Sequence, residues 1–419
     1  MSKQYQNFEI EKNDPFMINL SRREDQREKK HAYIAAAIIG GVVLVSLQIC
    51  GTVVNPSEYN LSLFERDSNT QSMKAYIDYL ARYKKTYADR QSTADRYKIF
   101  KQNYHLIQEH NRHADVLPFV MEVNQYADLT VDEFLEHHKL RVPKHLLTQE
   151  HDETPSKGIY SKGHGDAAPM FDTPVQNLPK VKDWYKEGAV SAPHDQHQCG
   201  SCWAFTTASM IESLAVISGK FDYPIELSIQ QLVDCDITND GCSGGWMYKG
   251  YAYASVYGLM PADTYPYVGK KNQCKYDKEK VLFKNNGMVQ EKKMSNEALK
   301  AIVAKQPVGV GMISNENLRF YKHGVMTESF LKCSDPTPAV NHGVAIVGFG
   351  HVQKGERGTG WCREYWIVRN TWGKAWGDDG FFKLCMDGTG SQEMPFGICQ
   401  VNRFPTYPTM EQPEIKFSQ

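Results

Sequence analysis

The sequence is short of net charge and, over much of its length, of cysteine. Its 419 residues include 48 Lys and Arg against 49 Asp and Glu, a formal net charge of -1. A balance this close to neutral provides no overall field that would attract nucleic acid. Residues 55–198 contain no cysteine, which excludes a disulfide framework from that part of the chain. The length still suffices for two globular units at roughly 100 to 200 residues each.

Charge is absent from one run of 23 residues, 32–54, with the sequence AYIAAAIIGGVVLVSLQICGTVV. A helix of this length spans a hydrocarbon core of about 30 Å. A buried core helix and a cleaved signal peptide are the alternatives, but the apolar region of a signal peptide is usually about 7 to 15 residues long. The basic residues that precede the run are Arg22, Arg23, Arg27, Lys29 and Lys30. The positive-inside rule therefore predicts a cytosolic tail over 1–31, a signal anchor over 32–54 and a single-pass type II membrane precursor.

Cysteine is concentrated in the C-terminal half. Of the ten cysteines, Cys50 lies in the apolar run and the other nine lie between residues 199 and 399. The predicted topology places these nine in an oxidising compartment, where disulfides form. Nine is an odd number, so one thiol stays free if the other eight pair.

Three further segments differ in composition. In 55–142, apolar residues recur at three- and four-residue intervals amid charge, which is typical of amphipathic helices. Residues 143–177 are rich in Pro, Gly, Ser, Asp and His, which favours an exposed and easily cut connector. In 178–419, helix-like segments precede short β-rich ones, so we expect an α+β domain of two lobes with a cleft between them.

The stretch HDQHQCGSCWAF contains Cys199 and Cys202 at Cys-x-x-Cys spacing. Such a pair can be a redox switch, half of a zinc site, or one structural and one nucleophilic cysteine. A thioredoxin motif should follow a strand in a βαβ setting, and a zinc site needs a second ligand pair. Because the sequence offers neither, we expect no metal and no cofactor. His342 and Asn370, each taken alone, are more readily structural.

Taken together, five segments carry more information than any one of them. They are the stretch from Gln196 to Phe205 and the blocks LSIQQLVDCD, GCSGGW, NHGVAIVGFG and YWIVRNTWG, in this order. On these segments the chain resembles the papain family of cysteine proteases, in particular its cathepsin L-like members, over about residues 75–410. The resemblance implies a peptide hydrolase with a two-lobed papain-like fold, one lobe helical and the other β-rich.

The helical segment is similar to the inhibitory prosegment of this family. Ser92 stands where Glu is usual and Glu122 where Gly is usual, and the matching residues are Arg96, Phe100, Asn103, Ile107, Asn111, Asn124, Tyr126 and Asp128. The resemblance implies a zymogen whose own prosegment lies backwards through the cleft as inhibitor. A membrane-anchored prosegment of this length resembles the falcipain-type enzymes of apicomplexan parasites.

The resemblance also implies the roles of individual residues. Cys202 would be the nucleophile and His342 the base, as a thiolate–imidazolium pair, with Asn370 orienting the imidazole under Trp372. Gln196 and the backbone amide of Cys202 would form the oxyanion hole. The substrate-binding residues would be Gly244, Gly245, Trp246, Met247, Gly311, Val340, Gly343, Trp372 and Val401. Since the pocket members are apolar or small, we expect Leu, Phe or Val two residues before the cut.

Cysteine pairing follows partly from the resemblance, which implies bridges from Cys199 to Cys242 and from Cys235 to Cys274. A third family bridge begins at Cys333; its usual partner position holds Phe396, so we expect Cys399 as the substitute. Two cysteines then remain, Cys362 and Cys385, which flank a predicted hairpin and are expected to pair. Cys202 is left free.

Two departures from the family pattern stand near these residues. His197 stands where Gly is usual and could narrow the cleft or add a titrating group. The segment HVQKGERGTGWCRE, between His342 and Asn370, is a predicted long loop.

We therefore expect a cysteine endopeptidase, made as a membrane-anchored zymogen and monomeric when mature, acting on proteins and peptides. Its compartment would be acidic (endosomal, lysosomal or food-vacuole-like) or the enzyme would be secreted, and the maturation cut would fall between about Met170 and Leu178. Asn60 is a candidate glycosylation site. A catalytically inactive papain-fold binding protein and a membrane scaffold that works through its N-terminal region are the alternatives.

Overall fold

The computed structural model describes residues 70–136, 140–144, 178–334 and 340–410. They belong to two compact units, one ending at His105 and the other running from Leu106. The predicted cytosolic tail, anchor, Asn60 and the region of the maturation cut before residue 178 lie outside the described residues. No helix within these described ranges is both long and apolar enough to cross a bilayer.

The described part of the first unit contains the helices α2 (Thr70–Arg82) and α3 (Arg90–Arg112), of which α3 continues into the second unit. Buried aromatic rings join them. The ring of Phe100 lies 5.1 Å from that of Tyr76 and 4.9 Å from that of Tyr79. The intervals predicted for an amphipathic segment therefore correspond to a helix pair that packs through aromatic side chains.

The second unit begins with the remainder of the prosegment-like region. It includes strand β1 (Phe119–Met121) and helix α4 (Val131–Leu135). The helix starts at Thr130, whose hydroxyl accepts from the backbone N–H of Glu133 while the Glu133 carboxylate accepts from the backbone N–H of Thr130. This reciprocal cap explains why so short a helix forms at this point.

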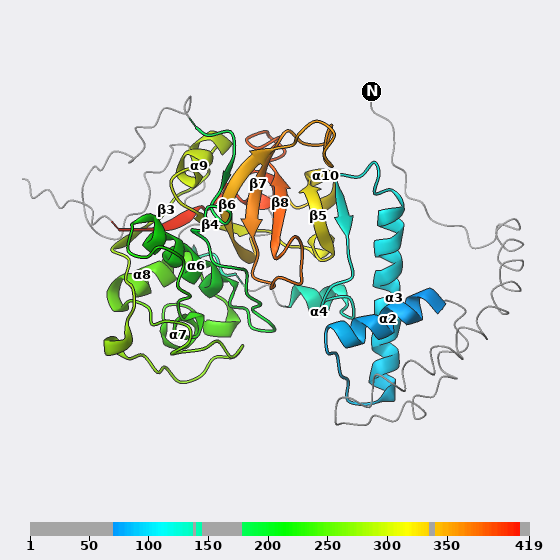
Figure 1. Ribbon diagram of the computed structural model, residues 1–419, viewed down its shortest axis with the longest axis horizontal. Coiled ribbons are helices and arrows are strands. Elements are labelled where there is room, and N and C mark those ends of the chain that lie inside the picture. Colours follow the sequence, from blue (N-terminus) through cyan, green and yellow to red (C-terminus); the bar gives the residue numbers. More distant parts are fainter. Residues whose placement is uncertain (1–69, 137–139, 145–177, 335–339, 411–419) are drawn as a thin grey trace, which may run out of the picture. The chain divides into compact units, whose positions relative to one another are not determined.

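A helical lobe follows, with β2 (Lys182–Asp183) in its lead-in. Its helices are α6 (Cys202–Ile217), α7 (Ile229–Cys235) and α8 (Met247–Tyr257), and η4 (Gly241–Ser243) precedes α8. Residues 202–215 of α6 are all buried. A helix that is buried on every face occupies the centre of its lobe. In Figure 1 the green helices lie to one side of the yellow and orange strands.

The β-rich lobe is built on one sheet. Within the described residues the strand order is β1-β5-β8-β7-β6-β4-β9-β3, with β2 also paired to β6. The further strands are β3 (Gly287–Gln290), β4 (Val308–Met312), β5 (Tyr321–Met326), β6 (His342–His351), β7 (Glu364–Arg369), β8 (Phe381–Cys385) and β9 (Thr406–Thr409). The short helices are η5 (Lys278–Lys280), α9 (Asn296–Val303), η6 (Glu316–Leu318), α10 (Glu328–Leu331) and η7 (Ile398–Gln400).

Strand β6 is the link between the two lobes. Residues 342–350 of β6 are buried in succession, as expected for a strand covered on both faces, and α6 packs on it. The first residue of α6 and the first residue of β6 are thereby brought to the same place. The α+β prediction is confirmed.

Candidate active site

The thiol of Cys202 lies where the helical lobe meets the sheet. Cys202 is the first residue of α6 and is fully buried. Its Sγ accepts a hydrogen bond of 3.4 Å from the backbone N–H of Gly343, the residue that follows His342 on β6. The N-terminus of a helix has unpaired N–H groups and a partial positive charge, which favours a negative charge on a side chain at this position.

The imidazole of His342 is held by two neighbours from the turn after β7. Its Nε2 lies 2.8 Å from Asn370 Oδ1, which also accepts from the backbone N–H of Thr371 at 2.8 Å. The indole of Trp372 stacks on the ring, with centroids 5.0 Å apart and planes at 25°. Because a carbonyl oxygen only accepts, the neutral imidazole carries its proton on Nε2, and Nδ1 is the basic nitrogen.

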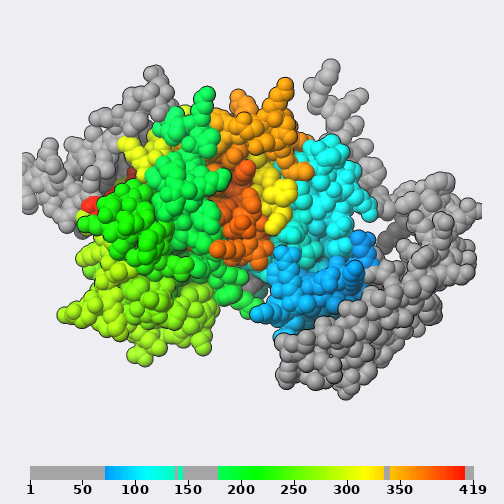
Figure 2. All heavy atoms as spheres, in the orientation of Figure 1, coloured from blue at the N-terminus to red at the C-terminus, as the bar shows by residue number. Residues whose placement is uncertain are grey.

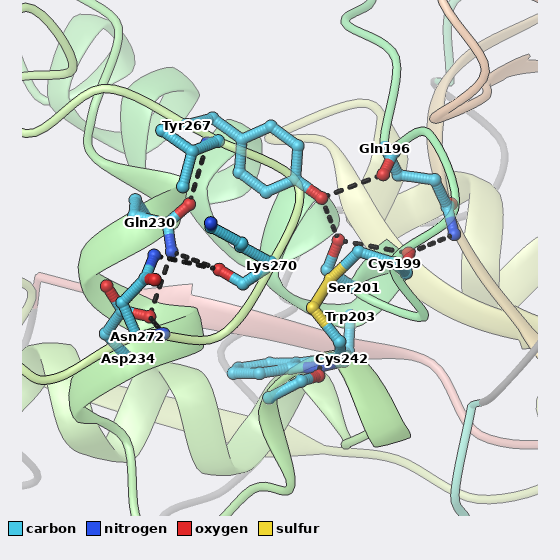
Figure 3. The surroundings of a disulfide bond; sticks show 12 residues. Gln196, Cys199, Ser201, Trp203, Gln230, Asp234, Cys242, Tyr267, Lys270 and Asn272 are labelled. Carbon is cyan, nitrogen blue, oxygen red and sulfur yellow. Dashed lines mark hydrogen bonds between the residues drawn. A yellow bond between two sulfur atoms is a disulfide. The ribbon is translucent and has the colours of Figure 1, made fainter.

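Gln196 lies on the loop before Cys199 and is fully buried (Figure 3). Its Oε1 accepts from Thr371 Oγ1 at 2.5 Å, and its Nε2 donates to the carbonyl of Cys199 at 3.0 Å. The hydroxyl of Tyr267 donates to the backbone carbonyl of Gln196 at 2.8 Å. These bonds fix the side-chain amide beside the loop that leads to Cys202.

His197 occupies the left-handed region, with φ of 52°. Glycine adopts this conformation without strain, which gives a physical reason for the usual Gly at this position. The backbone N–H of His197 donates to Asp195 Oδ1 at 2.8 Å, and its side chain is 67% exposed. A side chain this exposed points mainly into solvent.

The side chain of Leu140 packs among apolar residues close to Cys202. A Cβ built on Gly311 would lie 2.9 Å from Val340 Cγ2 and 3.1 Å from Leu140 Cδ2. A Cβ on Gly343 would lie 3.2 Å from both Leu140 Cδ1 and the sulfur of Met247. Only glycine leaves the room that the leucine side chain fills.

The backbone at Leu140 and Arg141 is hydrogen-bonded to two segments of the enzyme that are far apart in the sequence. The N–H of Leu140 donates to the carbonyl of Asn341 at 2.9 Å, and that of Arg141 donates to the carbonyl of Gly245 at 3.1 Å. Leu140 and Gly245 form a parallel bridge. Gly244, with φ of 113°, precedes this edge. Of the predicted pocket residues, Val401 is buried in the turn after η7, next to Cys399 and Gln400, which both have positive φ.

Prosegment residues also cover Trp372. The rings of Tyr126 and Phe134 meet the indole edge-on, with centroids 5.7 and 5.4 Å away. Gln125 Nε2 donates to the carbonyl of Trp372 at 2.7 Å. In the sequence, Tyr126 is part of the matched motif, but nothing distinguishes Gln125, Phe134 or Leu140 from other residues of a surface helix and loop.

Comparison with known proteins decides the family. Residues 178–409 match the description "Papain family cysteine protease", and residues 76–134 match "Cathepsin propeptide inhibitor domain (I29)". The chain belongs to the papain family of cysteine proteases. It is a papain-like enzyme made as a zymogen, with its own prosegment as inhibitor, as the resemblance predicted.

Relatives and solved structures of the papain family agree. Cysteine protease Amb a 11.0101 of Ambrosia artemisiifolia is 32% identical over 358 residues, covering 84% of this chain and 85% of that protein. Cathepsin L1 of Drosophila melanogaster is 33% identical over 345 residues, covering 80% and 85%. The structure of a recombinant stem bromelain precursor superposes with a TM-score of 0.66 at 26% identity, covering 81% of this chain and 99% of that one. The proform of Amb a 11 gives a TM-score of 0.63 at 30% identity, covering 82% and 95%.

Burial sets the protonation of the two central groups in this papain-family zymogen. It raises the pKa of the Cys202 thiol to about 11, against the opposing effect of backbone N–H groups, first among them that of Gly343. It lowers the pKa of His342 to about 4, against the hydrogen bond with Asn370. Desolvation thus favours the neutral thiol and neutral imidazole here, in place of the ion pair expected for the enzyme at work.

Four disulfides occur within the described residues. They join Cys199 to Cys242, Cys235 to Cys274, Cys333 to Cys399, and Cys362 to Cys385. The first anchors the loop that carries Gln196, as Figure 3 shows. Cys202 is the free cysteine of the described part of the chain.

Proposed function

We propose that the chain is an endopeptidase that cuts peptide bonds through an acyl-enzyme formed on Cys202. The observation that carries this proposal is the junction of α6 and β6, where the Cys202 sulfur lies 3.4 Å from the amide of Gly343, next to a histidine held by Asn370. A nucleophile, a base and a residue that orients the base are what covalent catalysis of acyl transfer requires.

The thiolate–imidazolium pair belongs, in this proposal, to the enzyme after the prosegment has left. Water and substrate dipoles then reach the cleft, the cost of desolvation falls, and the dipole of α6 favours the thiolate. Proton transfer from Sγ to Nδ1 of His342 gives the pair, since Nε2 already donates to Asn370.

The reaction then follows in balanced steps. The Cys202 sulfur attacks the scissile carbonyl carbon, a C–S bond forms, and the negative oxygen is stabilised by Gln196 Nε2 and the backbone N–H of Cys202. Imidazolium His342 gives its proton to the leaving amine as the C–N bond breaks. Water, deprotonated by the same histidine, hydrolyses the thioester and restores the thiol.

Selectivity is proposed to lie in the pocket that Leu140 fills. Leucine, phenylalanine or valine two residues before the cut would replace Leu140 between Gly311 and Gly343, with Trp246 and Met247 as walls. Burial of such a side chain is worth about 1.5 to 3 kcal/mol over exposure. The parallel bridge of Leu140 with Gly245 supports a prosegment whose chain runs in the direction opposite to that of a bound substrate. In this direction the peptide bonds of the prosegment are not presented to the Cys202 sulfur for attack.

The precursor is proposed to be a type II membrane protein divided at the predicted boundaries: a tail over 1–31, an anchor over 32–54, a prosegment over 55–142, a connector over 143–177 and the enzyme over 178–419. The uncharged run of 23 residues supports the anchor. Carbonate extraction of membranes tests it, since a spanning segment stays with the lipid. The compartment is proposed to be acidic, and the relation to falcipain-type enzymes stays a prediction.

Activity is tested with purified zymogen converted near pH 4 to 5. A thiol-reactive peptidyl epoxide should label one cysteine, Cys202. A peptide library should be cut at bonds that have an apolar residue two positions before the cut. Cys202→Ala should be neither labelled nor active. Normal folding without labelling or cleavage of any peptide would point to the inactive papain-fold binding protein, which the full set of active-site residues disfavours.

A further inference from the structure

The loop between β6 and β7, residues 352–363, contacts a part of the prosegment that lies outside the cleft. Trp361 Nε1 donates to the carbonyl of Val116 at 3.0 Å. The guanidinium of Arg357 donates to the carbonyl of Leu117 at 3.2 Å and to that of Ala114. The loop therefore places its donors on three backbone carbonyls of a single turn.

That turn directly follows the C-terminal end of α3. The helix ends at Arg112, and the chain continues through residues 113–117 in turns whose N–H groups bond back to residues 110, 111 and 113. The carbonyls of Ala114, Val116 and Leu117 therefore lie just beyond the helix, whose C-terminus adds a partial negative charge nearby. A cationic Arg357 and an indole N–H are the complementary donors for this turn.

Aromatic packing extends the same contact. The ring of Phe330, on α10, lies 5.6 Å from that of Trp361 and 5.3 Å from that of Phe119. The ring of His110 packs on Phe119, with centroids 4.3 Å apart, and lies 6.2 Å from that of Phe330. In Figure 2 the cyan atoms of this part of the chain lie directly against yellow and orange atoms of the β-rich lobe.

The loop is shaped by its own bonds. Thr359 Oγ1 donates to the carbonyls of Gln353 and Glu356, at 3.0 and 2.6 Å, and the backbone N–H of Gln353 donates to the Glu356 carboxylate at 3.0 Å. The disulfide from Cys362 to Cys385 ties its end to β8. A surface that is already formed loses little conformational entropy on docking.

We propose that loop 352–363 is a second docking surface for the prosegment, one that recognises the backbone carbonyls of the turn after α3 through Trp361 and Arg357. It continues the pairing of β1 with β5, where Val325 N–H donates to the carbonyl of Pro118 at 2.8 Å. The surface keeps residues 113–121 bound when the prosegment transiently leaves the cleft, so the cleft closes again by an intramolecular step. Its role in latency rests on the proposed function.

The test uses the full chain with Trp361→Phe, which keeps the ring and loses the N–H, and with Arg357→Gln. In a Cys202→Ala background, which cannot process itself, amide hydrogen exchange of residues 113–121 should accelerate at least tenfold in each variant. Arg357→Lys, which keeps the charge, should be intermediate. Lys354→Gln removes one charge from an exposed position of the same loop and is the matched control, expected to leave exchange unchanged.

With Cys202 present, Trp361→Phe and Arg357→Gln should convert severalfold faster near pH 5, while kcat/KM of the mature enzyme on a short peptide stays the same. Unchanged exchange of residues 113–121 in both variants, with the thermal midpoint of the parent protein, would overturn the docking surface. An inactive mature enzyme would instead count against the proposed function, because the exchange measurement requires no catalysis.

Discussion

The side chain of Gln196 is already fixed in the zymogen, where its proposed task of stabilising the oxyanion is not yet performed. Its amide is held at both ends, by Thr371 Oγ1 at 2.5 Å and by the carbonyl of Cys199 at 3.0 Å. A donor fixed before the reaction requires little reorganisation when charge develops on the substrate oxygen.

We predict that Gln196→Ala lowers kcat by about 10²- to 10³-fold and changes KM little, because the lost donor acts on the transition state. Thr371→Val, which removes only the bond that positions the amide, should cause a smaller loss, again in kcat. Steady-state kinetics on one short peptide measures both. A change confined to KM would assign Gln196 to ground-state binding.

In the proposed substrate pocket, Gly311 leaves the space that a side chain at this position would fill. A methyl group there would approach Val340 Cγ2 at 2.9 Å and the Trp246 ring at 3.0 Å. We predict that Gly311→Ala reduces the preference for Leu over Ala at the second position by about tenfold, since overpacking typically costs about 1 to 3 kcal/mol. The ratio of kcat/KM for two matched peptides measures it.

Gly350→Ala is the control for that experiment. It lies on β6 and would meet the Tyr365 hydroxyl at 2.8 Å, so it crowds the same sheet at another position. An equal loss of preference in Gly350→Ala and Gly311→Ala would show that sheet distortion, not pocket volume, determines the selectivity.

At the scale of elements, the pairing of β1 with β5 depends on one glycine. Gly324 has φ of 105° and pairs with Phe119, and a Cβ there would lie 2.6 Å from the Phe119 Cα and closer still to the carbonyl of Pro118. Both the backbone conformation and the close approach require glycine.

We predict that Gly324→Ala weakens docking of β1 and lets the zymogen convert severalfold faster at a given pH. Gly390→Ala is the matched control, because it lies outside loop 352–363 and has a similar φ of 85° with nothing within 4 Å of its Cβ position. Conversion followed by gel electrophoresis gives the rates. Equal rates for Gly324→Ala and the parent zymogen would show that β1 pairing does not limit opening.

The sequence predicts the helices and strands better than it predicts the tertiary contacts between them. The helical segment, the helix at Cys202 and the strand after His342 carry strong local patterns, because buried faces repeat at the helix or strand period. Trp361, Leu140 and Gln125 carry no such pattern. Their contacts depend on chain segments more than a hundred residues away, such as Val116 for Trp361 and Trp372 for Gln125. Periodicity is a local property and cannot report such contacts.

On the scale of the whole molecule, we predict that acidity opens the zymogen through three histidines. Burial lowers the pKa of His342 to about 4 and also lowers that of His110 and of His323. His323 lies on β5 opposite Val120 of β1, and His110 Nε2 lies 3.1 Å from the carbonyl of Phe119. The charged groups that act on the last two are Arg357, His113, Asp378, Lys322 and Glu122.

The sign of the pH effect follows from the lowered values. A histidine whose pKa is below 6.5 in the closed zymogen binds a proton more readily once it is exposed. The closed form is therefore fully favoured above about pH 6.5, loses stability as the pH falls, and for His342 loses no more below about pH 4. We predict that amide exchange of residues 113–121 in the Cys202→Ala zymogen accelerates across this window.

His110→Gln isolates one of the three groups. Glutamine can still donate to the carbonyl of Phe119 but does not titrate, so at pH 5 this variant should exchange and convert severalfold more slowly than the parent. His113→Gln, at an exposed position on the same turn, is the control and should follow the parent profile. If His110→Gln instead tracks the parent at every pH, acid opening does not depend on the titration of His110.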